Sequence, residues 1–316
     1  MTVRMTATAR TGSTTRTGST TRTAAGTGAG TPHPVHPAGT VRPPTAPALV
    51  VVAHGSRDPR ALSTVRALLG RVRALRPALP VRLGHIELNA PLLPDTLTAL
   101  GDGAAVLAPL LLSRGHHVAR DIPEMAGASP ARTRVAAPLG PHPLLVDALH
   151  ARLLEAGWPV GAGPEHAVVL ASAGSRALAS RTDTARTAAL LAARLGVPVL
   201  PAYASAAAPT VPEAVRALTA RGHRRVAVAS CFTAPGRFAT ECAAAAPWIV
   251  SAPLGTHPAM ARLLLHRYDE ALEHDEALER DEARRYDEAR SYDQARRCDG
   301  AHTTGGAPAR RTVAVG

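Results

Sequence analysis

The strongest constraint on the fold of this chain is an internal duplication. A short apolar run leads into Gly-Ser-Arg at residues 55–57 and again at residues 174–176, an offset of 119. Both copies then end on a nearly identical phrase, Pro-Leu-Gly-x-His-Pro, at residues 138–143 and 253–258, an offset of 115. A repeat of this length is longer than the unit of a solenoid and has the size of a domain. The sequence therefore predicts two similar domains in one chain.

Apolar runs alternate with helical patterns in each copy. The runs are continuous rather than alternating, which is typical of parallel strands buried on both faces. Asp58 followed by Pro59 predicts the start of a helix, because Asp caps helices and Pro fits the first helical position. We therefore predict an α/β fold of two similar parallel-sheet domains, at residues 48–160 and 165–265, from an internal duplication. The expected strands lie at residues 48–53, 81–88, 104–112, 167–172, 197–203 and 226–230.

Two segments of unusual composition flank the duplicated part. Residues 1–47 hold five Arg and no acid among Thr, Ala, Gly and Pro, and we expect a disordered tail because large apolar groups are scarce. Residues 266–316 form a charged tail in which Asp-Glu-Ala starts at 269, 275, 281 and 287, a period of six. Six residues turn a helix by about 240° net, so this repeat builds no coiled-coil seam. Pairs such as Glu276 and Arg280 favour a solvated helix, and a frayed appendage stays open as the alternative.

Composition excludes several classes of protein. The net charge is +12, and every fixed positive charge is an Arg because the chain has no Lys. Nucleic-acid binding is disfavoured because aromatics make up only 3% and no recognition motif is present. No apolar run approaches the roughly 18 residues of a membrane span, no secretory signal is recognisable, and the three Cys form no close pair. We expect a cytoplasmic protein without membrane or nucleic-acid partners.

Three side chains with metal-binding groups follow predicted strands of the first copy: His54, Glu87 and His117. Ligands of open parallel sheets bind beyond the carboxyl ends of the strands, and two imidazoles with a carboxylate suit Fe²⁺, Co²⁺ or Ni²⁺. The second copy lacks all three; the matching residues are Ala173, Ser205 and Phe238. His142 and His257 occur in both copies, so we expect them to be turn or packing residues. The differences predict a single site in the first half.

Three motifs carry these candidates: His-Gly-Ser-Arg-Asp-Pro from residue 54, Glu-Leu-x-x-Pro from residue 87, and Leu-Ser-Arg-Gly-His-His-Val-Ala-Arg-Asp-Ile-Pro from residue 112. Together they resemble the CbiX/SirB family of sirohydrochlorin chelatases, which are class II chelatases, in the long two-repeat form. The resemblance covers residues 48–265 and implies a chelatase-like fold. It implies an ATP-independent, lyase-type enzyme that inserts Fe²⁺ or Co²⁺ into sirohydrochlorin for sirohaem or cobalamin biosynthesis. It implies no organic cofactor, because the metal ion is a substrate.

The resemblance also implies roles for individual residues. His54 and His117 match the family's two His and are assigned to metal holding and proton abstraction, with His116 in place of the second Gly of the family's Gly-Gly-His-Val. Glu87 falls at the acidic metal contact. The substrate carries eight carboxylates, which guanidinium groups bind well. The predicted substrate-binding residues are Ser56, Arg57, Arg114 and Arg120, with Arg176 and Arg237 as candidates for the opposite wall.

Three questions stay open at this point. The sequence does not choose between the two imidazoles as the proton acceptor, or between Fe²⁺ and Co²⁺. The alternative function is a non-catalytic carrier that binds a tetrapyrrole or a metal. We expect a monomer, because both repeats already lie in one chain.

Overall fold

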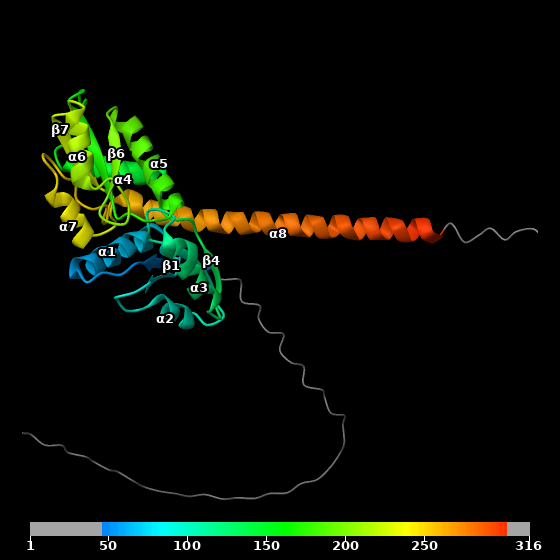
Figure 1. The fold of residues 1–316 in the computed structure, drawn as a ribbon. Coiled ribbons are helices and arrows are strands. Elements are labelled where there is room, and N and C mark those ends of the chain that lie inside the picture. The colour runs from blue at the N-terminus through cyan, green and yellow to red at the C-terminus, as the bar shows by residue number, and fades with distance from the viewer. Residues whose placement is uncertain (1–45, 302–316) are drawn as a thin grey trace, which may run out of the picture. The chain divides into compact units, whose positions relative to one another are not determined.

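The computed structural model describes residues 46–301, so the predictions for residues 1–45 and 302–316 lie outside the described part. It contains two parallel sheets, with strand orders β2-β1-β3-β4 and β6-β5-β7 (Figure 1). Every ladder between these strands is parallel, which confirms the predicted fold class. The strands are β1 (Ala48–Ala53), β2 (Val81–His85), β3 (Ala104–Pro109), β4 (Arg132–Val135), β5 (His166–Ser172), β6 (Val199–Tyr203) and β7 (Arg225–Ser230).

The helices follow the strands in the order that the repeats predict. The first begins at Pro59, and the side chain of Asp58 accepts a hydrogen bond from the amide of Arg60, as expected of a capping residue. In the first half the helices are α1 (Pro59–Leu75), α2 (Leu93–Thr98), α3 (Ile122–Gly127) and α4 (Pro143–Glu155), with a single π-helical segment, η1 (His117–Asp121), before α3. Those that follow are α5 (Leu178–Leu195), α6 (Val211–Ala220), α7 (Arg237–Ala244) and α8 (Pro258–Ala301).

The two sheets differ by one strand. β4 was not among the predicted strands, because its sequence Arg-Thr-Arg-Val is half polar and none of its residues is fully buried. It pairs with β3 in register over four residues. At the matching edge of the second sheet, the strand is reduced to a single bridge between Val228 and Val250. Otherwise the strand order of the first sheet is repeated in the second.

One hydrophobic cluster joins the two halves. It takes alternate side chains of the central strands, such as Val51 of β1 and Leu170 of β5, together with residues of α1, α4, α5 and the start of α8. The opposite face of each sheet has its own cluster, beneath α2 and α3 in the first half and beneath α6 and α7 in the second. Burying both faces of a sheet explains why its strands read as continuous apolar runs.

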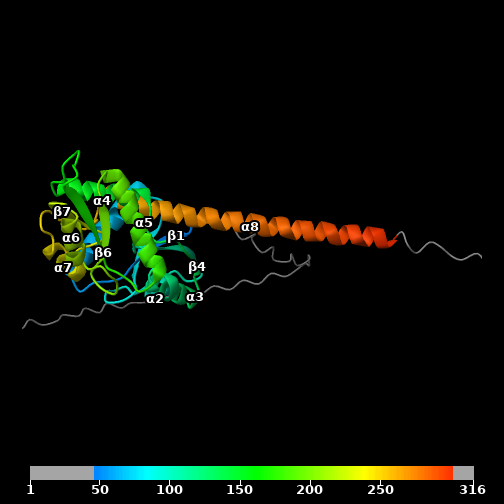
Figure 2. The same cartoon turned by 45° about the horizontal axis from the view of Figure 1, so that its top comes forward.

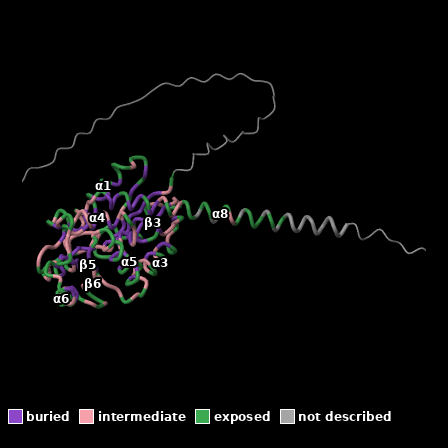
Figure 3. Tube along the Cα trace, turned by 90° about the horizontal axis from the view of Figure 1, so that it is seen from above, coloured by how far each residue is buried: buried purple, intermediate pink, exposed green. Residues whose placement is uncertain are grey.

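α8 begins in this shared core and continues beyond it as a helix, in which most of the described side chains up to residue 290 are exposed (Figures 2 and 3). The domain boundary predicted after residue 265 lies inside it. Arg76 binds both carboxylate oxygens of Asp269, at 2.6 and 2.8 Å, and the Tyr268 hydroxyl donates to the carbonyl of Pro47. The predicted ion pair between Glu276 and Arg280 forms, with an N–O distance of 2.7 Å.

No helix in the described part has the length and apolar content that crossing a bilayer requires.

His142 and His257, which the repeats marked as structural, act as helix caps. Nδ1 of His142 accepts the amide N–H of Leu144 at the start of α4, and Nδ1 of His257 accepts that of Ala259 in α8. Burial, reinforced by nearby guanidinium groups, lowers the pKa of both imidazoles below the ordinary 6.5. The neutral form, which can accept these hydrogen bonds, is therefore favoured.

Candidate functional site

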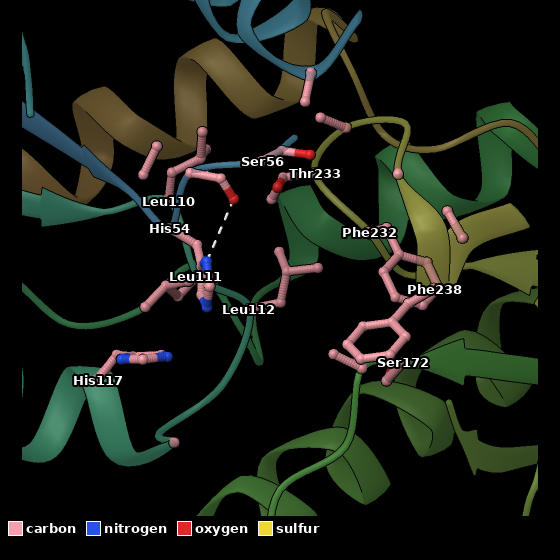
Figure 4. A pocket seen from close by; sticks show the side chains of 18 of the residues that line it. His54, Ser56, Leu110, Leu111, Leu112, His117, Ser172, Phe232, Thr233 and Phe238 are labelled. Atoms are coloured by element: carbon pink, nitrogen blue, oxygen red, sulfur yellow. Dashed lines mark hydrogen bonds between the residues drawn. The ribbon is translucent and has the colours of Figure 1, made fainter. Parts of the chain in front are cut away.

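Loops from both halves border one cavity of about 1090 Å³ at the carboxyl ends of the strands. Its walls come from the segments after β1, β2 and β3 and from those after β5, β6 and β7. Figure 4 shows His54 and His117 on one side of this space and Phe232 and Phe238 on the other. Small-molecule sites usually enclose about 300–1,000 Å³, so this cavity admits a large ligand.

His54 and Glu87 come from adjacent strands and meet beside this cavity. His54 directly follows β1, and its Nδ1 lies 3.5 Å from Oε1 of Glu87, which follows β2. The amide of Glu87 donates to the carbonyl of His54 at 3.0 Å. Gly55 has a φ of +102°, and a Cβ at that position would lie 1.9 Å from the carbonyl oxygen of Glu87. Only Gly fits this turn, so the invariant part of the repeat fixes the backbone that presents the imidazole.

His117 faces His54 from the start of η1. The centres of the two rings are 4.7 Å apart and the ring planes are nearly perpendicular, at 87°. Nδ1 of His117 lies 2.5 Å from Oδ2 of Asp121, one turn further along. Neighbouring His116 also lines the cavity, 3.5 Å from Oδ1 of the same carboxylate, but its side chain is 70% exposed. The residue that directly faces His54 is thus His117.

The predicted trio is arranged as a row, Glu87–His54–His117, which Asp121 extends by one member. Within residues 46–301, no three His, Cys, Asp or Glu side chains are already clustered tightly enough to hold an ion. Each imidazole has a carboxylate beside its Nδ1, which favours a proton on that nitrogen and leaves Nε2 as the free lone pair. Sequence reasoning did not assign Asp121 to the site, although its spacing of four residues from His117 in a helical segment was the available signal.

Ser56 and Arg57, two of the predicted substrate-binding residues, line the cavity. Ser56 also has a local structural role, because its Oγ accepts the amide N–H of Asp58 and its own amide donates to Oδ1 of Asn89. Arg57 forms no ion pair with any residue in the described range 46–301, so its guanidinium is available to a ligand.

Arg114 and Arg120 lie beside the motif but do not line the cavity. Arg114 binds Asp183 of α5 through its amide and through Nε and Nη2, at 2.7–3.2 Å. Burial raises the pKa of the Asp183 carboxyl, but the hydrogen bonds from Arg114 outweigh it and keep this pKa below the ordinary 3.8. Arg120 lies 3.5 Å from Glu124. Arg114 therefore ties the loop before His117 to the second half of the molecule.

The second half repeats the geometry of the turns without the metal-binding side chains. Ser205 donates its amide N–H to the carbonyl of Ala173 at 3.0 Å, as Glu87 does to His54. A Cβ on Gly174, which has a φ of +92°, would lie 1.9 Å from the carbonyl oxygen of Ser205. These contacts confirm that Ala173 and Ser205 occupy the places of His54 and Glu87.

Duplicated parallel α/β halves that share a cavity, with an imidazole pair at the strand ends of one half, define a chelatase-like protein. The comparison with protein families agrees in both halves. This chain belongs to the CbiX family, whose model matches residues 48–156 and again residues 167–271.

Among curated proteins, a sirohydrochlorin cobaltochelatase of Methanococcus maripaludis is 35% identical over 83 residues, which is 25% of this chain and 58% of that protein. A second sirohydrochlorin cobaltochelatase, of Methanococcus aeolicus, is 32% identical over the same length. The chain thus spans somewhat more than half the length of these relatives.

A solved structure covers far more of the chain. SirB from Bacillus subtilis, determined with Fe³⁺, aligns with 73% of this chain and 97% of its own, with a TM-score of 0.61 and 24% identity. At this level of identity the likeness establishes the shared fold.

Proposed function

We propose that this protein is a sirohydrochlorin chelatase that inserts Fe²⁺ or Co²⁺ without ATP or an organic cofactor. The observation that carries the proposal is the pair of facing imidazoles, His54 and His117, each with a carboxylate at Nδ1. Membership of the CbiX family and the names of the curated relatives support the choice of substrate.

Insertion of a divalent ion into a tetrapyrrole requires the loss of two pyrrole N–H protons and the partial desolvation of the ion. A neutral imidazole accepts a proton or donates a lone pair to a metal through the same Nε2 atom. Glu87 and Asp121 stabilise the imidazolium that forms when the nearby ring takes a proton. In this scheme one imidazole holds the incoming ion. The other takes the first pyrrole proton, releases it to solvent and then takes the second. The 4.7 Å separation of the rings lets both reach one macrocycle.

The carboxylates of the substrate need cations on both sides of the cavity. Arg57 lines the cavity in the first half, and Arg176 lines it at the matching place of the second half. The guanidinium fork binds a carboxylate bidentately, which a bound substrate with many carboxylates would use at its edges. Because one chain supplies both walls, the protein acts as a monomer in this proposal. The proposal also places the protein in the cytoplasm.

The test is a metal-insertion assay under anaerobic conditions. Purified protein is mixed with sirohydrochlorin and Co²⁺ or Fe²⁺, and the absorbance change of the macrocycle is followed. The expected result is a rate well above the uncatalysed one, which the variant His54→Ala/His117→Ala loses. His223→Ala, which removes a half-buried imidazole that lies outside the cavity and far along the chain from both motifs, serves as the control and retains the rate. A wild-type rate equal to the uncatalysed rate would overturn the proposal.

A further inference from the structure

The chain has two Phe residues in 316 positions, and both line the one cavity described above. Phe232 lies two residues beyond β7, and Phe238 lies in the first turn of α7. Aromatic residues are only 3% of the chain, so their placement together on one wall is a specific feature of the site. Figure 4 shows both rings across the cavity from His54 and His117.

Both rings replace cavity residues of the first half. The carbonyl of Phe232 accepts the amide N–H of Leu254 at 2.8 Å, as the carbonyl of Leu111 accepts that of Leu139 at 2.8 Å. Phe232 therefore takes the place of Leu111, which also lines the cavity. In the same way, Phe238 follows Gly236 by two residues, as His117 follows Gly115.

The two loops that carry these residues lie in equivalent settings. A Cβ on Gly236 would lie 3.8 Å from Oγ of Ser56, and a Cβ on Gly115 would lie 3.8 Å from Oγ of Ser175. Each loop thus lies close to the Gly-Ser-Arg turn of the other half. The position that presents an imidazole on one wall presents a phenyl ring on the opposite wall.

A phenyl ring at this position has a chemistry that suits a flat, conjugated ligand. It offers a π-face for stacking and excludes water, and it has no lone pair with which to bind a metal ion. The guanidinium of Arg237 lies over the Phe238 ring, 4.6 Å from its centre. A cation therefore covers one side of the ring, and a stacked ligand would use the other side. A planar ring with peripheral carboxylates matches this combination.

We infer that Phe238, with Phe232 beside it on the same wall, forms a stacking surface that holds the macrocycle with one face toward His54 and His117. Phe238 is a substrate-binding residue in this arrangement and takes no part in proton transfer or metal binding. The inference rests on the proposed chelatase function and names the part of the second half that recognises the tetrapyrrole.

The experiment compares Phe238→Ala, Phe238→Leu and Phe238→Tyr in the full-length protein. KM for sirohydrochlorin and KM for Co²⁺ are measured separately, together with kcat. Phe238→Ala is expected to raise KM for sirohydrochlorin by about ten-fold, because the stacking surface is lost. Leu restores only part of the affinity, since it is apolar but not flat, whereas Tyr restores most of it. KM for Co²⁺ and kcat stay within about two-fold, because the ring contacts neither the ion nor the proton acceptors.

Controls separate stacking from folding. Leu178→Ala removes an exposed apolar side chain of the second half that does not line the cavity, and it leaves all three constants unchanged. If Phe238→Ala does not fold, Phe238→Leu and Phe238→Tyr still differ in KM for sirohydrochlorin.

Two results overturn the inference in distinguishable ways. If the wild-type protein metallates sirohydrochlorin and the Phe238 variants have the same KM for it, the stacking surface is refuted and the proposed function stands. If the wild-type protein neither binds nor metallates sirohydrochlorin, both the stacking surface and the proposed function are refuted.

Discussion

The two halves of this protein share a scaffold and differ in the side chains that the scaffold presents. Gly55 and Gly174 adopt the same left-handed backbone, and each makes the same close approach to the next loop. His142 and His257 cap helices at matching places. In contrast, the second half has Ala173 at the position of His54 and Phe238 at the position of His117. Duplication thus kept what the turns and caps require, while the cavity walls diverged into a polar wall and an aromatic wall.

The sharpest way to break this comparison is to copy the second half into the first. The variant His117→Phe places the residue of the aromatic wall at the position of the imidazole. We expect the rate of metal insertion to fall at least about 100-fold, the usual contribution of a positioned acid or base. The absorbance assay with sirohydrochlorin and Co²⁺ measures this change.

An exchange in the opposite direction, Ala173→His, is the control; it places an imidazole in the second half at the position that matches His54. It adds an imidazole without Glu87 or Asp121 beside it, because Ser205 occupies the place of the carboxylate. Its activity should stay within about two-fold of wild type. Full activity in His117→Phe would show that the difference between the walls has no catalytic meaning.

Asp121→Asn examines one member of the row alone. Its carboxylate contacts Nδ1 of His117 at 2.5 Å, and partners of this kind usually change metal affinity or activity by about 10- to 100-fold. We expect a loss of roughly ten-fold in kcat/KM, together with weaker Co²⁺ binding by titration. Glu124→Gln, one turn along and exposed, should change neither quantity. An unchanged Co²⁺ affinity in Asp121→Asn contradicts its role in positioning His117.

Asp183→Asn targets the contact between the halves. The buried carboxylate accepts three hydrogen bonds from Arg114 within 3.0 Å, and its removal leaves that guanidinium without an anionic partner. We expect Tm to fall by roughly 3–6 °C at pH 7. Because the folded pKa of Asp183 is lower than 3.8, its contribution is fully present above that pH and is lost as the pH falls through the folded pKa.

Calorimetry from pH 7 down to pH 3 measures both effects. The difference in Tm between Asp183→Asn and wild type should narrow at the acid end of this range. A constant difference across the range would contradict the ionic character of the contact.

The smallest effects are expected at the two caps, which the halves share. His142→Ala and His257→Ala each remove a side-chain acceptor at a helix start, and each should cost about 1 kcal/mol of unfolding free energy. The folded pKa of both imidazoles lies below 6.5, so the stabilisation is fully present above pH 6.5 and is lost as the pH falls through the folded value.

Urea unfolding at pH 8 and pH 5 measures the free energy of each variant. Similar losses at pH 8 are expected in the two halves, and both should shrink at pH 5. A loss confined to one variant would show that the caps are not equivalent.

Much of this protein could be predicted from its sequence because the relevant signals are local. Continuous apolar runs marked the central strands, since both faces of each sheet are buried, and Asp58 with Pro59 marked the start of α1. The duplication provided an internal comparison. Residues kept in both copies, such as Gly55, serve the fold, whereas residues that differ between the copies, such as His54, are candidates for the site. Membership of the CbiX family followed from motifs within single loops.

Only the tertiary structure decided the contacts between residues far apart in the chain. β4 is polar and is recognisable only by its pairing with β3. Arg114 and Asp183 are 69 residues apart, and Arg76 and Asp269 are 193 residues apart, yet the fold brings each pair into contact. In the sequence, an Arg that faces solvent cannot be told from an Arg that pairs with a buried carboxylate. The sequence by itself determined the two-fold scaffold and its candidate imidazoles; the fold chose the partner of each charge, because that choice depends on which surfaces pack together.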